Sequence, residues 1–261
     1  MKKLICGDAL GELKKLDSDS IDVGITSPPY NKKGVRGTIV PNVVYDSSSD
    51  DLPEEYYQDM QVKVLDEVYR VLKPGGSFFY NHKLRFVNGA TLHPMEWIRR
   101  LKLTLRQEII WNRSIFANPR GWRFYSKDER IYWLYKSKNG AIGDEIGTIH
   151  AQLGSVWSMP PAHNSPHPAP FPPALATRVI YSMGLKSGVV LDPYVGSGTT
   201  CVVADYLGLG YIGIDCSSSY LESAKRRLLA YSHEKREMDL EMSKHKIFNP
   251  YAGKKNFKPL L

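Results

Sequence analysis

A short polar motif with two prolines follows an apolar segment near the N-terminus. The motif is Ser27-Pro28-Pro29-Tyr30, and it comes directly after the predicted strand 21–25 and Thr26. Proline fixes φ and has no N–H, so the carbonyl of Pro28 keeps its capacity to accept a hydrogen bond. Ser27 Oγ is a second acceptor, and the ring of Tyr30 offers a face for stacking. Two acceptors beside an aromatic ring suit chemistry on the amino group of a planar heterocycle, with a plain proline-rich turn as the alternative.

A second segment with chemical potential, Asp192–Thr200, follows the apolar run Val189–Leu191 and combines a carboxylate with a glycine turn. Gly196 and Gly198 let the backbone bend sharply and approach a ligand closely, and the helix expected near Thr199 presents unpaired N–H groups. The segment lacks the third glycine of a dinucleotide fingerprint and the Lys-Ser/Thr of a phosphate-binding loop. The turn therefore predicts a ligand site without identifying the ligand.

Two further carboxylates stand at the ends of other predicted strands. Asp215 ends the strand 210–215, where it can accept hydrogen bonds from both hydroxyls of a ribose and would repel a 2′-phosphate. Asp8 follows the strand 4–6 and can accept from an adenine amino group. Each carboxylate could instead cap the helix that follows it.

Strands and helices alternate along the chain, which predicts a mostly parallel sheet with helices on both faces. The predicted strands are 4–6, 21–25, 77–80, 107–112, 130–135, 189–191 and 210–215, and the predicted helices are 9–16, 54–72, 94–101, 173–183, 199–207 and 220–229. Segments without a sustained period are expected as loops, namely 32–53, 113–129 and 137–173.

Length, charge and cysteine usage limit the class of protein. The 261 residues suffice for one sizeable α/β core. The sequence has no run of eighteen apolar residues, so we expect no membrane span. The N-terminus, 1–8, is predicted to be a strand and not a signal peptide. Cys6, Cys201 and Cys216 have no metal-ligand spacing, so we expect no metal site and a cytoplasmic location. The net charge of +8 favours a polyanionic partner.

Together these segments resemble the DNA amino-methyltransferases that use S-adenosylmethionine and act on N4 of cytosine or N6 of adenine. That family pairs an Asp/Asn/Ser-Pro-Pro-Tyr/Phe tetrapeptide with an Asp-Pro-Phe-x-Gly-Ser-Gly-Thr-Thr loop, and here Tyr194 replaces the phenylalanine. The tetrapeptide precedes the loop, as in the circularly permuted β arrangement of the family. Leu72–Gly76 and His167–Pro172 also match, so the resemblance covers about residues 4–230.

The resemblance implies an α/β fold, a circularly permuted Rossmann-like methyltransferase with a mostly parallel sheet and helices on both faces. It implies a single domain over 1–261, with a catalytic half over about 1–136, a cofactor half over about 164–232 and a basic tail over 233–261. The segments 32–53, 113–129 and 137–163 are expected to be recognition or linker loops. We keep open the alternative of a catalytically silent DNA-binding module; a dinucleotide oxidoreductase is disfavoured by the two motifs.

The same resemblance implies the members of the active site. The expected catalytic residues are Ser27, Pro28, Pro29 and Tyr30. The expected cofactor-binding residues are Asp8, Ala9, His167, Phe171, Asp192, Pro193, Tyr194, Gly196, Gly198, Thr199, Thr200, Asp215 and Cys216, with His167–Phe171 against the methionine end.

Ser27 bears on which base is modified. Family members with serine here mostly modify cytosine N4 and those with aspartate mostly adenine N6, so we predict cytosine N4 and keep adenine N6 as the alternative. Accepting hydrogen bonds from the amine frees its lone pair, and a neutral hydroxyl is no strong base, so catalysis would come from positioning and from acceptors aimed at developing positive charge. The target base must leave the duplex stack, and Tyr30 would stack on it.

Three segments are expected to contact double-stranded DNA. Asn31, Lys32 and Lys33 would lie near the flipped nucleotide, with solvated loop charge as the alternative. The insert that contains Arg113, Arg120, Trp122, Arg123 and Lys127 is a basic and aromatic mix suited to phosphates, guanine edges or a wedge in the stack, with phosphates preferred. Arg120 and Arg123 could equally pair with Asp128 or Glu129 as surface charge. The recognition segment 137–163 is short, which predicts a short target or the help of a second subunit in a homodimer. A role in restriction-modification would add a cognate restriction endonuclease as partner.

Overall fold

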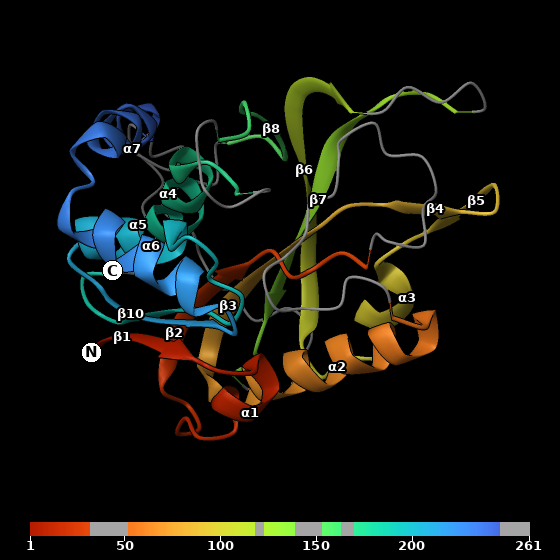
Figure 1. Ribbon diagram of the computed structural model, residues 1–261, viewed down its shortest axis with the longest axis horizontal. Coiled ribbons are helices and arrows are strands. Elements are labelled where there is room, and N and C mark those ends of the chain that lie inside the picture. The colour runs from red at the N-terminus through yellow and green to blue at the C-terminus, as the bar shows by residue number, and fades with distance from the viewer. Residues whose placement is uncertain (32–51, 118–122, 139–152, 163–169, 246–261) are drawn as a thin grey trace, which may run out of the picture.

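The computed structural model describes residues 1–31, 52–117, 123–138, 153–162 and 170–245, and an eight-stranded sheet forms its centre (Figure 1). The strand order is β1-β10-β9-β2-β3-β7-β6-β8. The strands are β1 (Lys2–Cys6), β2 (Ile21–Thr26), β3 (Leu72–His82), β6 (Thr104–Ala117), β7 (Ser126–Tyr135), β8 (Val156–Ser158), β9 (Val189–Asp192) and β10 (Gly210–Asp215). A separate hairpin consists of β4 (Arg85–Val87) and β5 (Ala90–Leu92).

The first five strands in this order run parallel, so their carboxyl ends meet at one edge of the sheet. β7 is antiparallel to β3 and to β6, and β8 pairs with β6 in parallel. The apolar residues of β2 and β9 are largely buried, as expected for parallel strands that are covered on both faces. Ser27, Asp192 and Asp215 lie at this edge, at or directly after the ends of β2, β9 and β10.

Helices cover both faces of the sheet, which confirms the predicted architecture (Figure 1). The helices are α1 (Ala9–Leu13), α2 (Glu54–Val71) and α3 (Met95–Ile98) on one face, and α4 (Pro173–Ser182), α5 (Thr199–Tyr206), α6 (Ser218–Leu229) and α7 (Ser232–Lys244) on the other. Leu65, Val68 and Phe78 belong to the buried cluster on the first face. Val179 and Val203 belong to the buried cluster on the second face. Among the described residues no helix has the length and apolar character that a membrane crossing needs.

The expectation of an irregular insert over 113–129 is wrong. β6 continues to Ala117 and β7 begins at Ser126, and these two residues pair across a hairpin. Ser114, with φ of +60°, lies where the register shifts. The hairpin extends beyond the body of the sheet (Figure 1). Strands that do not cover a core need no alternation of apolar residues, so this polar segment gave no strand pattern in the sequence. β8 also lies in a segment predicted as a loop, because three residues are too few to show a period.

The expectation of a basic tail from residue 233 is wrong over the described part of that segment. α7 packs on α4, and Met238 and Glu241 are fully buried. Arg178 Nε donates to Glu241 Oε1 at 2.6 Å, and His245 Nε2 lies 3.0 Å from the same oxygen. Burial alone would raise the pKa of Glu241, but hydrogen bonds from His245 and Arg178 lower it to about 2. The helix is highly charged, so its single buried stripe gives only a weak apolar pattern.

Candidate active site

The parallel strand ends bring the two predicted motifs together. β2 and β9 are neighbours in the sheet, with Gly24 opposite Leu191, so the chain leaves both strands at the same edge. Thr26 Oγ1 donates to Asp192 Oδ1 at 2.7 Å, a buried bond between residues 166 positions apart in the sequence. The tetrapeptide 27–30 and the glycine turn therefore begin side by side.

Asp192 fixes the start of the glycine turn. Its Oδ1 also accepts from the backbone N–H of Tyr194 at 3.1 Å, and its Oδ2 accepts from Thr200 Oγ1 at 2.6 Å. Burial raises the pKa of Asp192 to about 6, although the hydrogen bonds from Thr200 and Thr26 oppose the rise. Asp192 thus ties the turn to β2 on one side and to the first residues of α5 on the other.

The turn itself needs its glycines. Gly196 has φ of +49° and Gly198 has φ of +88°, a region that favours glycine. A Cβ on Gly198 would lie 2.6 Å from the Cβ of Ala224, so α5 and α6 can pack this closely only without a side chain there. The backbone N–H of Gly196 donates to Asp215 Oδ2 at 2.9 Å. The turn is therefore held against the end of β10.

Of the two carboxylates that could cap a helix, one does so and the other does not. Asp8 is the N-cap of α1 and accepts from Gly11 N at 2.8 Å. Asp215 is not a cap, because Ser217 caps α6, and Asp215 instead accepts from the backbone N–H of Ser217 and Gly196. Burial raises the pKa of Asp215. The ribose and adenine contacts expected of these carboxylates stay predictions.

The structure places all but one of the other expected cofactor residues. Ala9 begins α1 and Cys216 follows β10, and both lie at the ends of the paired strands β1 and β10. Burial and the nearby carboxylate of Asp8 raise the pKa of Tyr194, which packs against the buried cluster that includes Leu191. Pro193, Thr199 and Thr200 are buried within the turn, and Phe171 is buried in the core beside α4. His167 lies outside the described residues.

Four side chains at the catalytic corner form a hydrogen-bonded group that we call the Tyr30 network: Ser27, Tyr30, Asn81 and Glu129. Ser27 Oγ lies 2.5 Å from Tyr30 Oη, which donates to Glu129 Oε2 at 3.0 Å. Asn81 Nδ2 donates to Tyr30 Oη at 2.8 Å and to Glu129 Oε2 at 2.9 Å, and it lies 3.3 Å from Ser27 Oγ. Tyr30 is only 4% exposed, and its stacking on a base stays a prediction.

Sequence reasoning missed Asn81 and Glu129. Asn81 is in β3 and Glu129 in β7, and both side chains are buried. A polar residue directly after the apolar run Phe78–Tyr80 is a usable signal for Asn81, since it falls near a strand end. Glu129 gives no such signal, because its proximity to Tyr30 depends on the pairing of β7 with β3.

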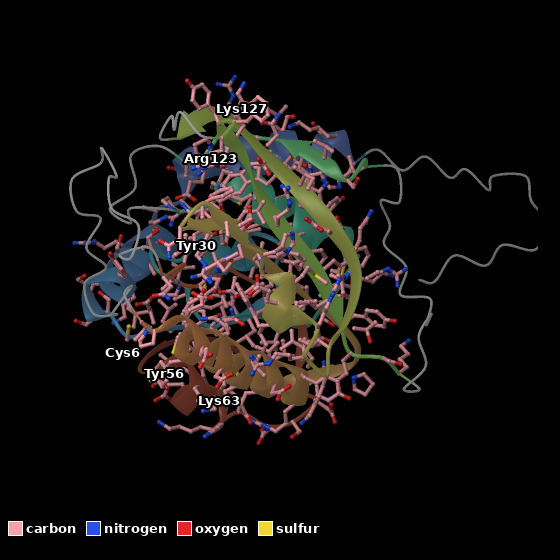
Figure 2. The ribbon with its side chains drawn as sticks, turned by 90° about the vertical axis from the view of Figure 1, so that its right-hand side faces the viewer. Cys6, Tyr30, Tyr56, Lys63, Arg123 and Lys127 are labelled. Carbon is pink, nitrogen blue, oxygen red and sulfur yellow. The ribbon has the colours of Figure 1, made fainter. Side chains whose placement is uncertain are left out.

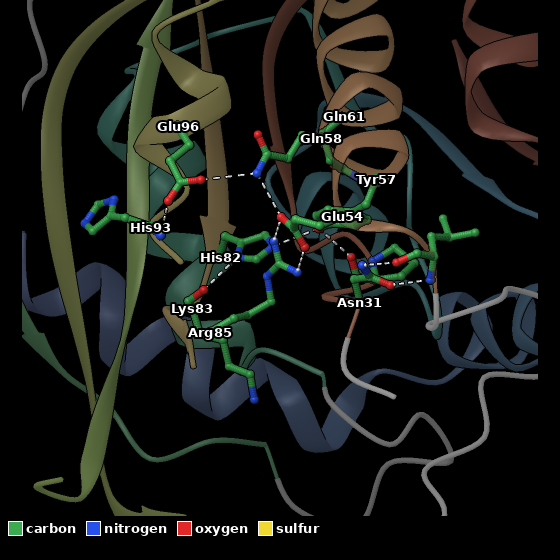
Figure 3. A network of polar contacts seen from close by, with 12 residues as sticks. Asn31, Glu54, Tyr57, Gln58, Gln61, His82, Lys83, Arg85, His93 and Glu96 are labelled. Atoms are coloured by element: carbon green, nitrogen blue, oxygen red, sulfur yellow. Dashed lines mark hydrogen bonds and ion pairs between the residues drawn. The ribbon is translucent and has the colours of Figure 1, made fainter. Parts of the chain in front are cut away.

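A second layer of polar contacts supports the prolines (Figure 3). Tyr57 Oη donates to the carbonyl of Pro29 at 2.9 Å and lies 2.8 Å from Nε2 of the buried His82. The Arg85 guanidinium lies 4.7 Å from the centre of the Tyr57 ring and donates two hydrogen bonds of 2.6 Å to Glu54. The position of Pro29 is therefore set by α2 and β3, which flank β2.

Asn31 directly follows the tetrapeptide and bonds to Leu52 at the start of the next described stretch. Its Nδ2 donates to the carbonyl of Leu52 at 2.9 Å, and its Oδ1 accepts from Leu52 N at 2.6 Å (Figure 3). Asn31 has φ of +52°, which asparagine tolerates better than most residues. A DNA contact from Asn31 stays a prediction, and Lys32 and Lys33 lie outside the described residues.

The expected DNA-binding residues divide between the hairpin base and its far end. Arg113 Nη1 donates to Glu129 Oε1 at 3.0 Å, so this arginine supports the Tyr30 network. Arg123 donates to the carbonyl of Phe124 and packs on the ring of Phe86, with 4.1 Å to the ring centre. In the view of Figure 2, Arg123 and Lys127 are labelled toward the top of the molecule, above Tyr30. Arg120 and Trp122 lie outside the described residues.

Comparison with known proteins identifies the family. A model of the N6_N4_Mtase family, described as DNA methylase, matches residues 21–226. The chain belongs to this DNA methylase family. It is similar to the Type II methyltransferase M.HpaI of Haemophilus parainfluenzae, with 30% identity over 250 residues that cover 87% of this chain and 74% of the relative. It is also similar to the DNA adenine methyltransferase YhdJ of Escherichia coli K12, with 29% identity over 95% of this chain and 90% of the relative.

Solved structures of similar proteins have the same fold as this DNA methylase. The PvuII DNA methyltransferase, described as cytosine-N4-specific, superimposes with a TM-score of 0.71 at 20% identity, over 95% of this chain and 93% of that one. TTHA0409 of Thermus thermophilus superimposes with a TM-score of 0.65 at 25% identity, over 90% of this chain and 96% of that one. The predicted α/β methyltransferase fold is thereby confirmed.

Proposed function

We propose that this DNA methylase transfers a methyl group from S-adenosylmethionine to N4 of cytosine in double-stranded DNA. Ser27 carries the choice of base. It follows β2 beside the glycine turn, and its hydroxyl is a neutral acceptor held at 2.5 Å by Tyr30. Adenine N6 is the second candidate, because the similar protein YhdJ is named an adenine methyltransferase whereas the PvuII enzyme is described as cytosine-N4-specific.

The residues around the glycine turn fit S-adenosylmethionine. Without side chains, Gly196 and Gly198 allow a close approach to the backbone, and the partly exposed Asp215 and the exposed Asp8 supply carboxylates at the two neighbouring strand ends. A structure of TTHA0409, at 24% identity and a TM-score of 0.64, is complexed with S-adenosyl-L-methionine. When bound, this cofactor supplies an electrophilic methyl group. The glycine turn and the two carboxylates would bind and orient it.

The catalytic corner acts on the amino group of the target base. Ser27 Oγ and the carbonyl of Pro28 accept hydrogen bonds from the amine, which draws its nitrogen toward tetrahedral geometry and frees the lone pair. A neutral serine is a weak base, so rate acceleration comes from positioning and from acceptors aimed at the positive charge that develops on nitrogen. The base reaches this corner only after it has left the duplex stack.

The far end of the β6–β7 hairpin is the surface that we propose for DNA. Phe124 is 99% exposed and Tyr125 is 51% exposed, and Arg123 and the exposed Lys127 flank them. Cations bind phosphates, and an exposed aromatic side chain can stack on or wedge between bases. The similarity to the Type II methyltransferase M.HpaI supports a role in restriction-modification. In that role a cognate restriction endonuclease acts on the same DNA sites.

Methylation of duplex DNA with labelled S-adenosylmethionine, followed by nucleoside mass spectrometry, tests activity and base together. We expect N4-methylcytosine as the product. N6-methyladenine alone would replace the cytosine proposal with the adenine one, and the absence of any methylated nucleoside on mixed genomic DNA would reject both.

A further inference from the structure

A buried carboxylate on β7 stands behind the catalytic serine. Glu129 is 6% exposed, and its Oε2 accepts from Tyr30 Oη at 3.0 Å and from Asn81 Nδ2 at 2.9 Å. Its Oε1 accepts from Arg113 Nη1 at 3.0 Å, so a guanidinium balances its charge. A buried carboxylate with this many donors holds each of them in a fixed direction.

The carboxylate determines which way the hydroxyl protons point. An ionised Glu129 can only accept, and a hydrogen bond to a charged acceptor is about twice as strong as one between neutral groups. The single proton of Tyr30 Oη is therefore directed to Glu129, and Tyr30 Oη accepts from Asn81 Nδ2. In the 2.5 Å contact between Ser27 and Tyr30, Ser27 must then be the donor. With its proton used in this way and Asn81 Nδ2 donating to it at 3.3 Å, Ser27 Oγ presents a remaining lone pair to an incoming N–H.

The same carboxylate fixes the amide of Asn81. Nδ2 must face Glu129, because the opposite orientation would place two acceptors against each other. Asn81 Oδ1 is then turned away from Glu129, and it is buried without a hydrogen-bond partner among the described residues. Asn81 is 1% exposed, and a buried amide oxygen without a partner is costly, so the contact with the Glu129 carboxylate must outweigh this cost to hold the amide in one orientation.

We propose that Glu129 is a positioning residue: it fixes the Asn81 amide and directs the protons of Tyr30 and Ser27, so that Ser27 Oγ, beside the Pro28 carbonyl, accepts from the amino group of the target base. This inference rests on the proposed amino-methylation. Glu129 acts through Tyr30 and Asn81 and does not itself contact the base. Only the Tyr30 hydroxyl lies between Glu129 and Ser27 in this chain of hydrogen bonds, so the negative charge of Glu129 also stabilises the positive charge that develops on the amine.

The variant Glu129→Gln tests the proposal because glutamine keeps the shape and removes the charge that orders the protons. We expect kcat to fall on the order of 10- to 100-fold, while the Kd for S-adenosylmethionine and for duplex DNA changes less than about 3-fold. The matched control is Glu108→Gln, since Glu108 forms an ion pair of 2.7 Å with Arg130 in the same hairpin. The control is expected to keep kcat within about 2-fold.

A double-mutant cycle separates positioning from a general loss of structure. In a Ser27→Ala background, Glu129→Gln should lower kcat by less than about 3-fold, because the residue it positions is gone. The same loss of kcat with and without Ser27, or a kcat unchanged by Glu129→Gln, would overturn the proposal. If Glu129→Gln does not fold, Tyr30→Phe replaces it, with the same non-additivity expected against Ser27→Ala.

These results are distinguishable from a failure of the proposed base. All rate ratios are measured on whichever nucleoside the wild-type protein methylates. A wild-type product of N6-methyladenine would reject the cytosine proposal, while the cycle would still decide the role of Glu129.

Discussion

The glycine turn and the catalytic corner lie at the same edge of the sheet but are built in different ways. Many anchors of the turn lie within one stretch of sequence, from Asp192 to Ser217, where backbone N–H groups donate to the carboxylates of Asp192 and Asp215. Thr26 and Arg227 add contacts from outside that stretch. The catalytic corner takes Ser27, Asn81 and Glu129 from three strands or their ends, and its contacts are between side chains. A contiguous site tolerates distant changes, whereas an assembled site depends on the register of every strand that contributes.

Ser27→Ala should give the largest effect and tests whether the corner sets the rate and not the affinity. We expect kcat to fall about 100- to 1,000-fold, because an acceptor aimed at the reacting amine is lost, with the Kd for S-adenosylmethionine within about 2-fold. Rates come from single-turnover methyl transfer and affinity from calorimetry. Ser20→Ala, at the opposite end of β2, is the control, and near-normal turnover of Ser27→Ala would remove the serine from the mechanism.

Asp215→Ala tests the opposite half of the comparison. Loss of a partly buried carboxylate should weaken S-adenosylmethionine binding by about 10-fold or more, with duplex DNA affinity within about 2-fold. Calorimetry measures the first and fluorescence anisotropy the second. Asp205→Ala removes a carboxylate of α5 that pairs with Lys2, and it should leave both affinities unchanged. An unaltered cofactor affinity in Asp215→Ala would exclude the ribose contact.

Thr26→Val tests the joint between the two regions. The hydroxyl of this buried residue bonds to Asp192, and its removal should lower the free energy of unfolding by about 1–2 kcal/mol in urea titrations. Thr177→Val is the matched control, because the Thr177 hydroxyl is buried without a hydrogen-bond partner among the described residues. It should change stability by less than about 0.5 kcal/mol. Equal losses in the two variants would mean that the Thr26–Asp192 bond contributes nothing of its own.

Phe124→Ala tests whether the far end of the β6–β7 hairpin, beyond the catalytic corner, contacts DNA. We expect duplex DNA affinity to fall about 3- to 10-fold, through loss of stacking, with no change in cofactor affinity. Leu240→Ala removes another exposed apolar side chain, 59% exposed on α7, and should not alter DNA affinity. Identical anisotropy curves for wild type and Phe124→Ala would place the DNA elsewhere.

The comparison also explains what could be predicted from the sequence. The glycine turn, the tetrapeptide and the parallel strands are local patterns of spacing and hydrophobicity, and the structure has each of them. The contacts of Glu129 depend on β3–β7 pairing, and the burial of Glu241 depends on the docking of α7 on α4. Neither pairing leaves a period in the sequence. Arg113 bonds to Glu129, a contact that the sequence did not indicate because a neighbouring strand supplies the carboxylate, and its phosphate contact stays a prediction.

The place of β1 in the sheet has a consequence for synthesis on the ribosome. This first strand pairs with β10, where Lys2 lies opposite Tyr211 and Cys6 opposite Asp215. At ordinary elongation speeds, a nascent chain therefore carries β1 unpaired for about 10 to 40 s before its neighbour exists. During that interval the backbone groups of β1 are available to chaperones or to other nascent chains, and this edge of the sheet forms only after β10 has been made.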